Sequence, residues 1–307
     1  MKHFLTLADL TPEQMQSLLD LAVRIKSAWK AGEETPYLKG KVLGMIFQKP
    51  SLRTRVSFDV AMLHLGGNAL YLSPDEIQLG KRESVADVAR VISRYVNVVM
   101  ARVFAHADVV ALAKYATVPV INGLSDYSHP CQGMADFLTI LEHKGSFTGK
   151  KLTYLGDGNN VATSLLYGAA LLGMDFSIAT PKGYGLHPAV WDMGRRMAAQ
   201  TGSQLVATDD PFVAVQDADV IYTDTWTSMG QEAEAEQRRK LFPPYRVDDA
   251  KLARAKSDVI VMHCLPAHRG EEITDAVADG PHSALFDQAE NRLHAQKAIL
   301  VWVLDGA

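Results

Sequence analysis

Short apolar runs alternate with helical patterns along almost the whole chain, and this alternation constrains the fold more than any other feature. Between the runs, apolar residues recur at the spacing of amphipathic helices. Strands that alternate with helices predict parallel sheets covered by helices on both faces. We therefore expect an α/β protein with doubly wound parallel sheets. The predicted strands are residues 42–47, 69–72, 98–101, 118–121, 152–155, 176–179, 204–206, 220–222 and 259–262.

The segment 145–151 is the expected boundary between two domains. It is small, polar and basic, and it separates two series of alternating strands and helices. A chain of 307 residues is long enough for two domains with their own cores. We predict a first domain over residues 1–145 and a second over 151–286, followed by a last helix near 287–304.

Composition excludes several classes of protein. A net charge of −4 gives no overall attraction to nucleic acid or anionic membranes. The two cysteines, Cys131 and Cys264, do not suggest a disulfide framework. The N-terminal residues lack the apolar core of a signal peptide, and no apolar run is long enough to span a bilayer. We expect a soluble, cytoplasmic protein without nucleic-acid or membrane partners.

The stretch 47–55 predicts an anion site. The strand at 42–47 is followed by a helix that begins near Ser51, and the free N–H groups of a helix start attract anions. Lys49, Arg53 and Arg55 surround this turn, together with the hydroxyls of Ser51 and Thr54. The alternative is a capped helix with a solvated basic face. Because cations at a helix start oppose the helix dipole, we favour a phosphate or carboxylate site.

Further polar residues follow other predicted strands of the first half. Arg102 and His129, like Arg53, each follow a predicted strand. Ligands bind at the carboxyl ends of parallel strands, so these side chains are candidates for one site. His129 and Gln132 lie three residues apart at the start of a helix, so both side chains can face one ligand. A helix cap beside a buried histidine explains this pair equally well.

A glycine-rich turn follows the first strand of the second half. Gly156 and Gly158 resemble part of a dinucleotide-binding motif, but Val161 occupies the position of the third glycine and no acid closes the next strand. A turn in which Asn159 adopts a positive φ also accounts for the pattern. Asn160, at the following helix start, is a candidate for binding a small polar ligand.

Two more strand ends carry candidate residues. Asp224 and nearby hydroxyls suit the ammonium and carboxylate groups of an amino acid, although a simple turn is the usual explanation. Cys264 follows the strand at 259–262 and is either a packing residue or a thiol at the ligand. Neighbours on a strand point to opposite faces, so we do not expect His263 and Cys264 to share a metal ion.

In this order, these stretches resemble carbamoyltransferases, and in particular the ornithine carbamoyltransferase family. The resemblance covers nearly the whole chain. The family's Ser-Thr-Arg-Thr-Arg phosphate motif is kept except that Leu52 replaces the first threonine, which removes one hydroxyl. The matching stretches are Ser51-Leu52-Arg53-Thr54-Arg55, His129-Pro130-Cys131-Gln132, Asp224 with Ser228-Met229-Gly230, His263-Cys264-Leu265-Pro266 and Glu290-Asn291-Arg292.

The resemblance implies transfer of a carbamoyl group from carbamoyl phosphate to the δ-amino group of L-ornithine. It also implies two domains joined by helices, an active site in the cleft between them, and a last helix, 287–307, that packs back on the first domain. The implied catalytic residues are Arg102, His129 and Cys264. The implied carbamoyl phosphate contacts are Ser51, Leu52, Arg53, Thr54, Gln78, Arg102, His129, Gln132, Cys264, Leu265 and Arg292. The implied ornithine contacts are Asn160, Asp224, Ser228 and Met229.

The resemblance further implies no metal and no organic cofactor, because carbamoyl phosphate is already an activated donor. Family members are homotrimers or assemblies of trimers, in which Gln78 reaches the site of the neighbouring subunit. Within the family, Ser228-Met229-Gly230 and Cys264 disfavour aspartate as the acceptor, and putrescine lacks the carboxylate that this loop binds. N-acylated ornithine remains open as an acceptor, as does the direction of flux. A non-catalytic ligand-binding relative is the alternative from another class.

Overall fold

The computed structural model describes residues 2–227 and 232–304. Its contacts divide the chain into two compact units: unit 2 comprises Thr139–Ala289, and unit 1 comprises the residues before and after it. Helix α6 (Pro130–Lys144) leads from unit 1 into unit 2, and helix α13 (Leu285–Val303) leads back. No helix of the described residues is long and apolar enough to cross a membrane.

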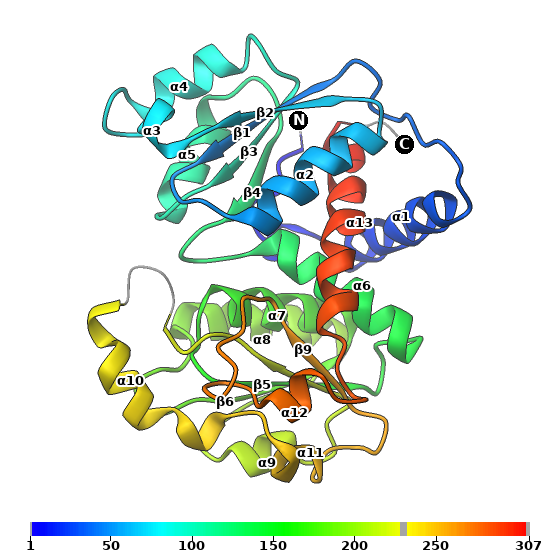
Figure 1. Cartoon of the computed structure of the whole chain (residues 1–307), viewed down its shortest axis with the longest axis vertical. Coiled ribbons are helices and arrows are strands. Elements are labelled where there is room, and N and C mark those ends of the chain that lie inside the picture. Colours follow the sequence, from blue (N-terminus) through cyan, green and yellow to red (C-terminus); the bar gives the residue numbers. More distant parts are fainter. Residues whose placement is uncertain (1, 228–231, 305–307) are drawn as a thin grey trace. The chain divides into compact units, whose positions relative to one another are not determined.

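Unit 1 contains a parallel sheet of four strands in the order β2-β1-β3-β4 (Figure 1). The strands are β1 (Val42–Phe47), β2 (Asn68–Leu72), β3 (Val98–Arg102) and β4 (Val120–Leu124). The helices are α1 (Pro12–Lys30), α2 (Leu52–His64), α3 (Pro74–Ile77), α4 (Val85–Ile92) and α5 (His106–Tyr115), with a short 3₁₀ turn at Leu7–Asp9.

Unit 2 contains a parallel sheet of five strands in the order β7-β6-β5-β8-β9. The strands are β5 (Lys151–Leu155), β6 (Asp175–Ala179), β7 (Leu205–Thr208), β8 (Val220–Thr223) and β9 (Ile260–His263). The helices are α7 (Asn160–Leu172), α8 (Pro188–Thr201), α9 (Pro211–Val215), α10 (Ala235–Leu241), α11 (Asp249–Leu252) and α12 (Asp275–Ala278), with 3₁₀ turns at Glu232–Glu234 and Pro243–Tyr245. The prediction of two parallel α/β sheets is confirmed.

The central strands of each sheet are buried, and their alternate residues point to opposite faces. In unit 1, Ile46 and Ala101 pack in one core with α4 and α5, while Phe47 contacts the ring of Tyr71. In unit 2, the core on one face includes residues of α9 and α12, and Figure 1 shows α7 and α8 on the other face. Residues 161–171 of α7 are all buried, which explains why this helix is apolar around its whole circumference.

The element boundaries differ from the sequence prediction where local chemistry intervenes. Strand β4 begins at Val120 rather than at residue 118, because Pro119 has no N–H and contributes only its carbonyl, which accepts from Val99 (2.9 Å). The segment between β2 and α4 contains helix α3, which begins with a capping box between Ser73 and Glu76. Arg102 is the last residue of β3 instead of following it.

A buried histidine on α13 makes the stability of the protein sensitive to acid. The side chain of His294 is fully buried, and its ring lies 5.2 Å from the ring of Trp29. Burial, together with neighbouring positive charges, lowers the pKa of His294 to about 3. These charges belong to Lys297, Lys26, Lys30 and His64. The side chain of Glu290 is half-exposed, and its Oε1 lies 3.5 Å from Nε2 of His294.

We predict that stability falls as the pH drops below 6.5. His294 stays neutral in the folded chain down to a pKa of about 3, whereas the unfolded chain takes up the proton near 6.5. The free energy of unfolding should therefore decrease by about 1–2 kcal/mol between pH 7.5 and pH 5 through this group. Equilibrium urea unfolding at both pH values tests the prediction. His294→Leu should remove this part of the pH dependence, and an unchanged slope in the variant would contradict it.

Candidate functional site

In each sheet the strand order reverses at one place, and predicted site residues follow the strands beside it. In unit 1, β1 pairs with both β2 and β3, and in unit 2, β5 pairs with both β6 and β8. Open α/β sheets bind ligands beyond the carboxyl ends of the strands at such points. The backbone N–H of Gln48, after β1, donates to the carbonyl of Arg102 at the end of β3 (2.8 Å). Each unit therefore has one expected ligand position.

Helix α2 starts at the carboxyl end of β1, as the sequence predicts. Ser51 is the N-cap, and its hydroxyl accepts from the backbone N–H of Thr54 (3.4 Å). Thr54 is fully buried, whereas the side chain of Leu52 is 76% exposed. The replacement of the family's threonine by Leu52 therefore places an apolar side chain in solvent and leaves the helix start intact.

The three cations of this turn have different surroundings. Lys49 and Arg55 lie over aromatic rings, at 4.4 Å and 4.0 Å from the ring centres. Arg53 is half-buried, and its charge lowers the pKa of His129. Arg53 thus differs in its surroundings from the two cations that stack on aromatic rings, and the sequence alone did not show this difference.

His129 lies in a strongly electropositive part of unit 1. It is 5% exposed, and Arg102 and Arg292 beside it are 7% and 4% exposed. Burial lowers the pKa of His129 well below its usual value, and the charges of Arg292, Arg102 and Arg53 lower it further. The imidazole is therefore neutral at physiological pH. Three guanidinium groups around a neutral imidazole form a site suited to a multiply charged anion.

A hydrogen-bonded network orients the amide of Gln132 in the same region. Its Nε2 donates to Asp136 Oδ1 (2.7 Å), and its Oε1 accepts from Arg292 Nη1 (2.8 Å). Arg292 Nη2 also donates to the hydroxyl of Thr54 (3.2 Å). Helices α2, α6 and α13 are joined in this way. The carboxylate can only accept and the guanidinium can only donate, so the two partners fix which end of the amide is the oxygen.

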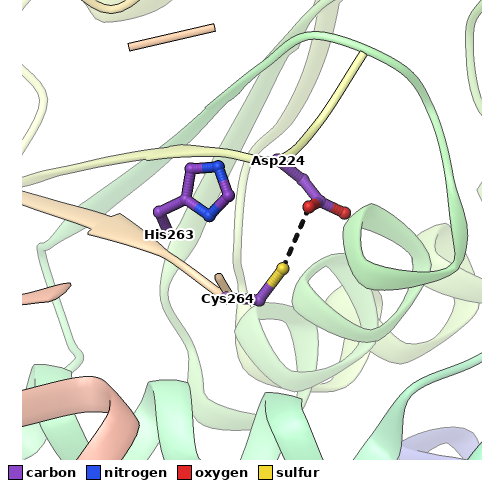
Figure 2. Close-up of side chains that lie close together, drawn as sticks. All are labelled: Asp224, His263 and Cys264. Atoms are coloured by element: carbon purple, nitrogen blue, oxygen red, sulfur yellow. Dashed lines mark hydrogen bonds between the residues drawn. The ribbon is translucent and has the colours of Figure 1, made fainter. Parts of the chain in front are cut away.

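In unit 2, Asp224 accepts hydrogen bonds from three donors after the end of β8. Asn159 Nδ2 donates to Oδ2 (2.7 Å), while Cys264 Sγ and the backbone N–H of Thr225 donate to Oδ1 (3.0 and 2.8 Å). Figure 2 shows the thiol of Cys264 pointing toward this carboxylate. The contacts join the ends of β5, β8 and β9, so Asp224 lies at the point where the strand order reverses.

The turn after β5 is built differently from the prediction. Asn159 has φ −91°, so the alternative in which this residue adopts a positive φ is wrong, and Gly156 adopts a positive φ of 133° instead. Asn159 is the N-cap of α7, and its Oδ1 accepts from the N–H groups of the next turn. The backbone of Gly185 packs directly against Gly158. A Cβ atom at position 158 would lie only 2.5 Å from the carbonyl carbon of Gly185, so only glycine fits there. Asn160, the predicted ornithine contact, is the first residue of α7 and is half-buried.

His263, Cys264 and Asp224 come closer together than strand alternation predicts. One possible ligand atom from each lies within 4.8 Å of the others, because β9 ends at His263 and Cys264 no longer follows the strand. However, His263 Nδ1 accepts from the N–H of Leu265 (2.8 Å), and Nε2 lies 3.0 Å from Glu272 Oε1. A metal ion on His263 would have to break one of these hydrogen bonds.

Two predicted ornithine contacts, Ser228 and Met229, lie outside the described residues. The chain on both sides is held by Arg238, which is buried. Its Nη1 donates to the carbonyl of Trp226 (2.8 Å), and its Nη2 pairs with Glu234 (3.0 Å). The described neighbours of this segment are thus attached to one side chain of α10.

Two of the predicted carbamoyl phosphate contacts, Gln78 and Leu265, lie at turns with an unusual backbone conformation. Gln78 is exposed and ends α3 with φ 40°, and its amide donates to the carbonyl of Asp75 (3.3 Å). Leu265 is half-buried and also has a positive φ, 58°. A positive φ is uncommon for residues other than glycine, so surrounding contacts must hold both residues in place.

Sequence reasoning missed three polar side chains of these sites. Asp136 lies four residues after Gln132 on one helix, and this spacing could have identified it. Asn159 was treated as a turn residue, but it binds Asp224. Glu272 is nine residues from His263 in a loop, and no pattern in the sequence pairs the two.

Comparison with known proteins agrees with this geometry. Residues 2–142 match the carbamoyl-P binding domain of the aspartate/ornithine carbamoyltransferase family, and residues 148–303 match its Asp/Orn binding domain. The chain is 56% identical over 305 residues to "Ornithine carbamoyltransferase" of Pyrococcus horikoshii, covering 99% of this chain and 96% of that protein. It is also 56% identical over 305 residues to "Ornithine carbamoyltransferase, anabolic" of Pyrococcus furiosus, covering 99% and 97%.

Solved structures give the same result. The structure of ornithine carbamoyltransferase from Pyrococcus furiosus has a TM-score of 0.97 and 56% identity, covering 100% of this chain and 98% of that one. Both halves of the chain match, and the motifs at the strand ends occur in the family's order. The chain therefore belongs to the aspartate/ornithine carbamoyltransferase family.

Proposed function

We propose that the protein is an ornithine carbamoyltransferase, which converts carbamoyl phosphate and L-ornithine to L-citrulline and phosphate. The observation that carries this proposal is the neutral His129 among Arg53, Arg102 and Arg292, at the expected ligand position of unit 1. An anionic acyl donor needs both cations for its phosphate and an uncharged hydrogen-bond donor for its carbonyl. The Asp224–Cys264 pair in unit 2 suits the acceptor amine.

The phosphate is proposed to bind at the start of α2. The free N–H groups of the helix start and the hydroxyls of Ser51 and Thr54 donate to its oxygens, and Arg53 and Arg102 balance its charge. Leu52 contributes its backbone N–H. These groups are charged or fixed by the helix. They therefore stabilise the negative charge of the phosphate as it leaves the carbamoyl group.

The carbonyl of the carbamoyl group is proposed to face His129 and Arg102. As the δ-nitrogen attacks, negative charge develops on the carbonyl oxygen, and a preorganised donor stabilises it. His129 donates one N–H as a neutral imidazole, because its pKa is far below neutral pH. The new C–N bond forms, the C–O bond to phosphate breaks, and phosphate leaves with the proton that the attacking nitrogen gives up.

The carbamoyl NH₂ group needs acceptors. Gln132 Oε1 already accepts from Arg292, but a carbonyl oxygen has a second lone pair, which is available to the substrate. The backbone carbonyls of Cys264 and Leu265 are proposed as further acceptors. Arg292 holds Gln132 in this orientation and adds charge to the phosphate site.

The amino-acid end of ornithine is proposed to bind in unit 2. Asp224 supplies a carboxylate for an ammonium group, and Asn160 lies at the start of the adjacent helix. Ser228 and Met229 are proposed contacts of the same substrate. Cys264 is proposed to lie beside the δ-nitrogen, since its thiol is oriented by Asp224.

One assay separates this function from its alternatives. Citrulline formation from carbamoyl phosphate is measured with ornithine, N-acetylornithine, putrescine and aspartate side by side. We expect kcat/KM to be at least about 100-fold higher for ornithine than for the other acceptors. Putrescine lacks the carboxylate of ornithine, N-acetylornithine has no α-ammonium group for Asp224, and aspartate has no δ-amine. Preference for N-acetylornithine would reassign the acceptor. Absence of any carbamoyl transfer would support a non-catalytic relative.

The δ-amine must lose a proton before it attacks, which predicts a pH effect. An alkyl ammonium has a pKa near ~10, so kcat/KM for ornithine should rise with pH through the alkaline range. Cys264→Ser keeps the shape but changes the group beside the amine, so turnover and ornithine affinity should both fall. A full pH–rate profile of both proteins tests this. If turnover, affinity and the alkaline limb are all unchanged in Cys264→Ser, the cysteine only packs.

We also propose that the protein forms trimers, or assemblies of trimers, in the cytoplasm, with residues 1–145 and 151–286 as its two functional domains. Large apolar side chains on α2 support a subunit interface, since Leu52 is 76%, Val56 48% and Leu63 69% exposed. Gln78, which is exposed, is proposed to complete the site of a neighbouring subunit.

Subunit mixing tests the shared site. Arg53→Ala and Gln78→Ala each damage a different part of it, so a mixed trimer contains some sites with both residues intact. After exchange of equal amounts, about one quarter of the sites should regain activity. Mixing Arg53→Ala with the double variant Arg53→Ala/Gln78→Ala is the matched control and should restore none. Exchange confirmed by native mass spectrometry without regained activity would exclude sharing.

A further inference from the structure

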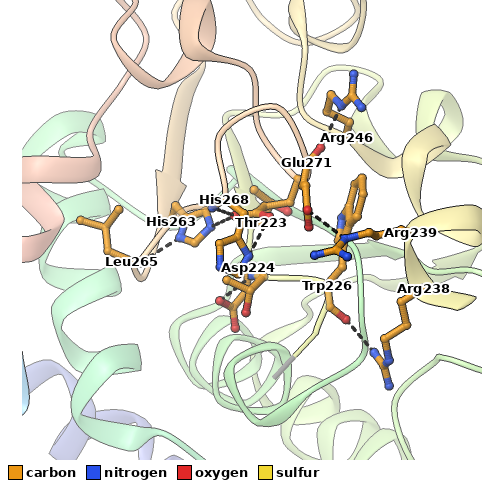
Figure 3. Close-up of polar contacts among 12 residues, drawn as sticks. Thr223, Asp224, Trp226, Arg238, Arg239, Arg246, His263, Leu265, His268 and Glu271 are labelled. Atoms are coloured by element: carbon orange, nitrogen blue, oxygen red, sulfur yellow. Dashed lines mark hydrogen bonds and ion pairs between the residues drawn. The ribbon is translucent and has the colours of Figure 1, made fainter. Parts of the chain in front are cut away.

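A fully buried glutamate lies behind the loop that carries Cys264 and Leu265. Glu272 is 0% exposed and His263 is 1% exposed, and Nε2 of the histidine lies 3.0 Å from Oε1 of the glutamate. The same oxygen accepts from the backbone N–H of His268 (2.5 Å). Glu272 therefore contacts the chain at both ends of the 264–268 segment. Figure 3 shows the hydrogen bond from Leu265 to His263 in this segment.

The hydrogen bonds around His263 form a directed chain. The N–H of Leu265 donates to Nδ1 (2.8 Å), so Nδ1 must carry a lone pair rather than a proton. The proton of the imidazole is then on Nε2, from which it is donated to the carboxylate of Glu272. Without this acceptor, the N–H of Leu265 alone among these contacts would favour that tautomer.

Leu265 needs this support because of its backbone conformation. Its φ of 58° lies in the left-handed region, which is unfavourable for a leucine. The bond from its N–H to His263 fixes the peptide that joins it to Cys264. That peptide contains the carbonyl of Cys264, and it immediately precedes the carbonyl of Leu265.

Glu272 is itself firmly attached to unit 2. Its backbone carbonyl accepts from the N–H of Val247 (2.9 Å). The preceding Glu271 accepts from Arg239 Nε through its carboxylate (3.0 Å) and from Arg246 Nε through its carbonyl (2.8 Å), as Figure 3 shows. The carboxylate of Glu272 is thus a fixed reference point rather than a mobile side chain.

We propose that Glu272 is a positioning residue for carbamoyl transfer: by selecting the Nε2–H tautomer of His263, it holds Leu265 and the adjoining Cys264 peptide in the orientation that the reaction requires. This inference rests on the proposed function, because it takes Cys264 and Leu265 to face the reacting groups. Glu272 touches no substrate in this role. Its effect should therefore be larger on turnover than on the binding of carbamoyl phosphate, whose proposed phosphate contacts lie in unit 1.

Two substitutions of Glu272 separate positioning from simple packing. Glu272→Met keeps the approximate size and removes the acceptor, and we expect kcat to fall by about 100-fold, the cost of a misplaced reacting group. Glu272→Gln retains a carbonyl oxygen that can accept from His263, so kcat should recover to within about 10-fold of the unaltered protein. The dissociation constant of carbamoyl phosphate, measured by calorimetry, should change much less than kcat in both, because the proposed phosphate contacts lie in unit 1. A kcat within 2-fold of normal in Glu272→Met would overturn the proposal.

A double-mutant cycle shows whether Glu272 acts through His263. In His263→Asn, the Oδ1 can still accept from Leu265, but the link to the glutamate is lost. Adding Glu272→Gln to His263→Asn should then cause little further loss of kcat, so the effects are not additive. Additive losses would show that Glu272 acts independently and would overturn the proposal. This cycle does not depend on Glu272→Met folding.

The tautomer can also be observed without any enzyme assay. In protein with ¹⁵N-labelled histidine, His263 should show a protonated Nε2 and an unprotonated Nδ1, with the signal assigned through His263→Asn. A protonated Nδ1 would overturn the inference even if the enzyme is fully active. Conversely, the expected tautomer with no citrulline formation by the unaltered protein would reject the proposed function alone.

Discussion

Replacing Arg102 by methionine is expected to reduce kcat/KM for carbamoyl phosphate by about 100- to 1,000-fold, as when one donor to a developing charge is removed. Arg102 is 7% exposed at the end of β3, and its charge acts on His129. Methionine fills a similar volume without charge, so the phosphate and the carbonyl oxygen both lose a buried cation. Steady-state kinetics with carbamoyl phosphate as the varied substrate measure the effect.

Arg55→Met is the matched control for this experiment. Arg55 is exposed and lies 4.0 Å from the ring centre of Tyr71, so its removal should change kcat/KM by less than about 3-fold. A second readout is the pKa of His129, which should rise in Arg102→Met, because one of the charges that lower it has been removed. Equal losses in both arginine variants would show that net charge, rather than a specific site, governs binding.

Asp224→Asn is expected to weaken ornithine binding by about 10- to 100-fold, because a charge-assisted bond of roughly 1.5–3 kcal/mol loses its charge. The substitution keeps the size of the side chain. An asparagine oxygen can still accept from Asn159 or Cys264, so the ends of the strands should remain in place. Ornithine affinity is measured by calorimetry in the presence of a carbamoyl phosphate analogue.

The binding of carbamoyl phosphate alone provides the internal control. Its proposed phosphate contacts lie in unit 1, whereas Asp224 lies in unit 2. Its affinity should therefore stay within about 2-fold of normal in Asp224→Asn. A parallel loss of both affinities would show that Asp224 supports the structure of the site and does not recognise the amino acid. Asp192→Asn, an exposed acid of α8, controls for the change in net charge.

The local features of this protein were determined by its sequence. The alternation of apolar runs and helical patterns predicted both parallel sheets, because strand and helix periodicities are properties of neighbouring residues. The start of α2 could be predicted in the same way, since the Ser51 cap involves only residues of one turn. Asp224, His129 and Arg53 were predicted as site residues because ligands bind at the ends of parallel strands.

The tertiary structure decided how these groups are paired and charged. Arg292 contacts Gln132 and Thr54, which lie 160 and 238 residues away in the chain, and no local pattern specifies such partners. Asp224 accepts a hydrogen bond from Asn159, whereas a simple turn is the usual explanation for an acid in such a stretch. Glu272 pairs with His263 across a loop. The neutrality of His129 depends on burial and on cations from α2, β3 and α13. Desolvation and long-range contacts exist only after the elements have packed, which is why the sequence supplied candidate residues for the site but not their protonation or their partners.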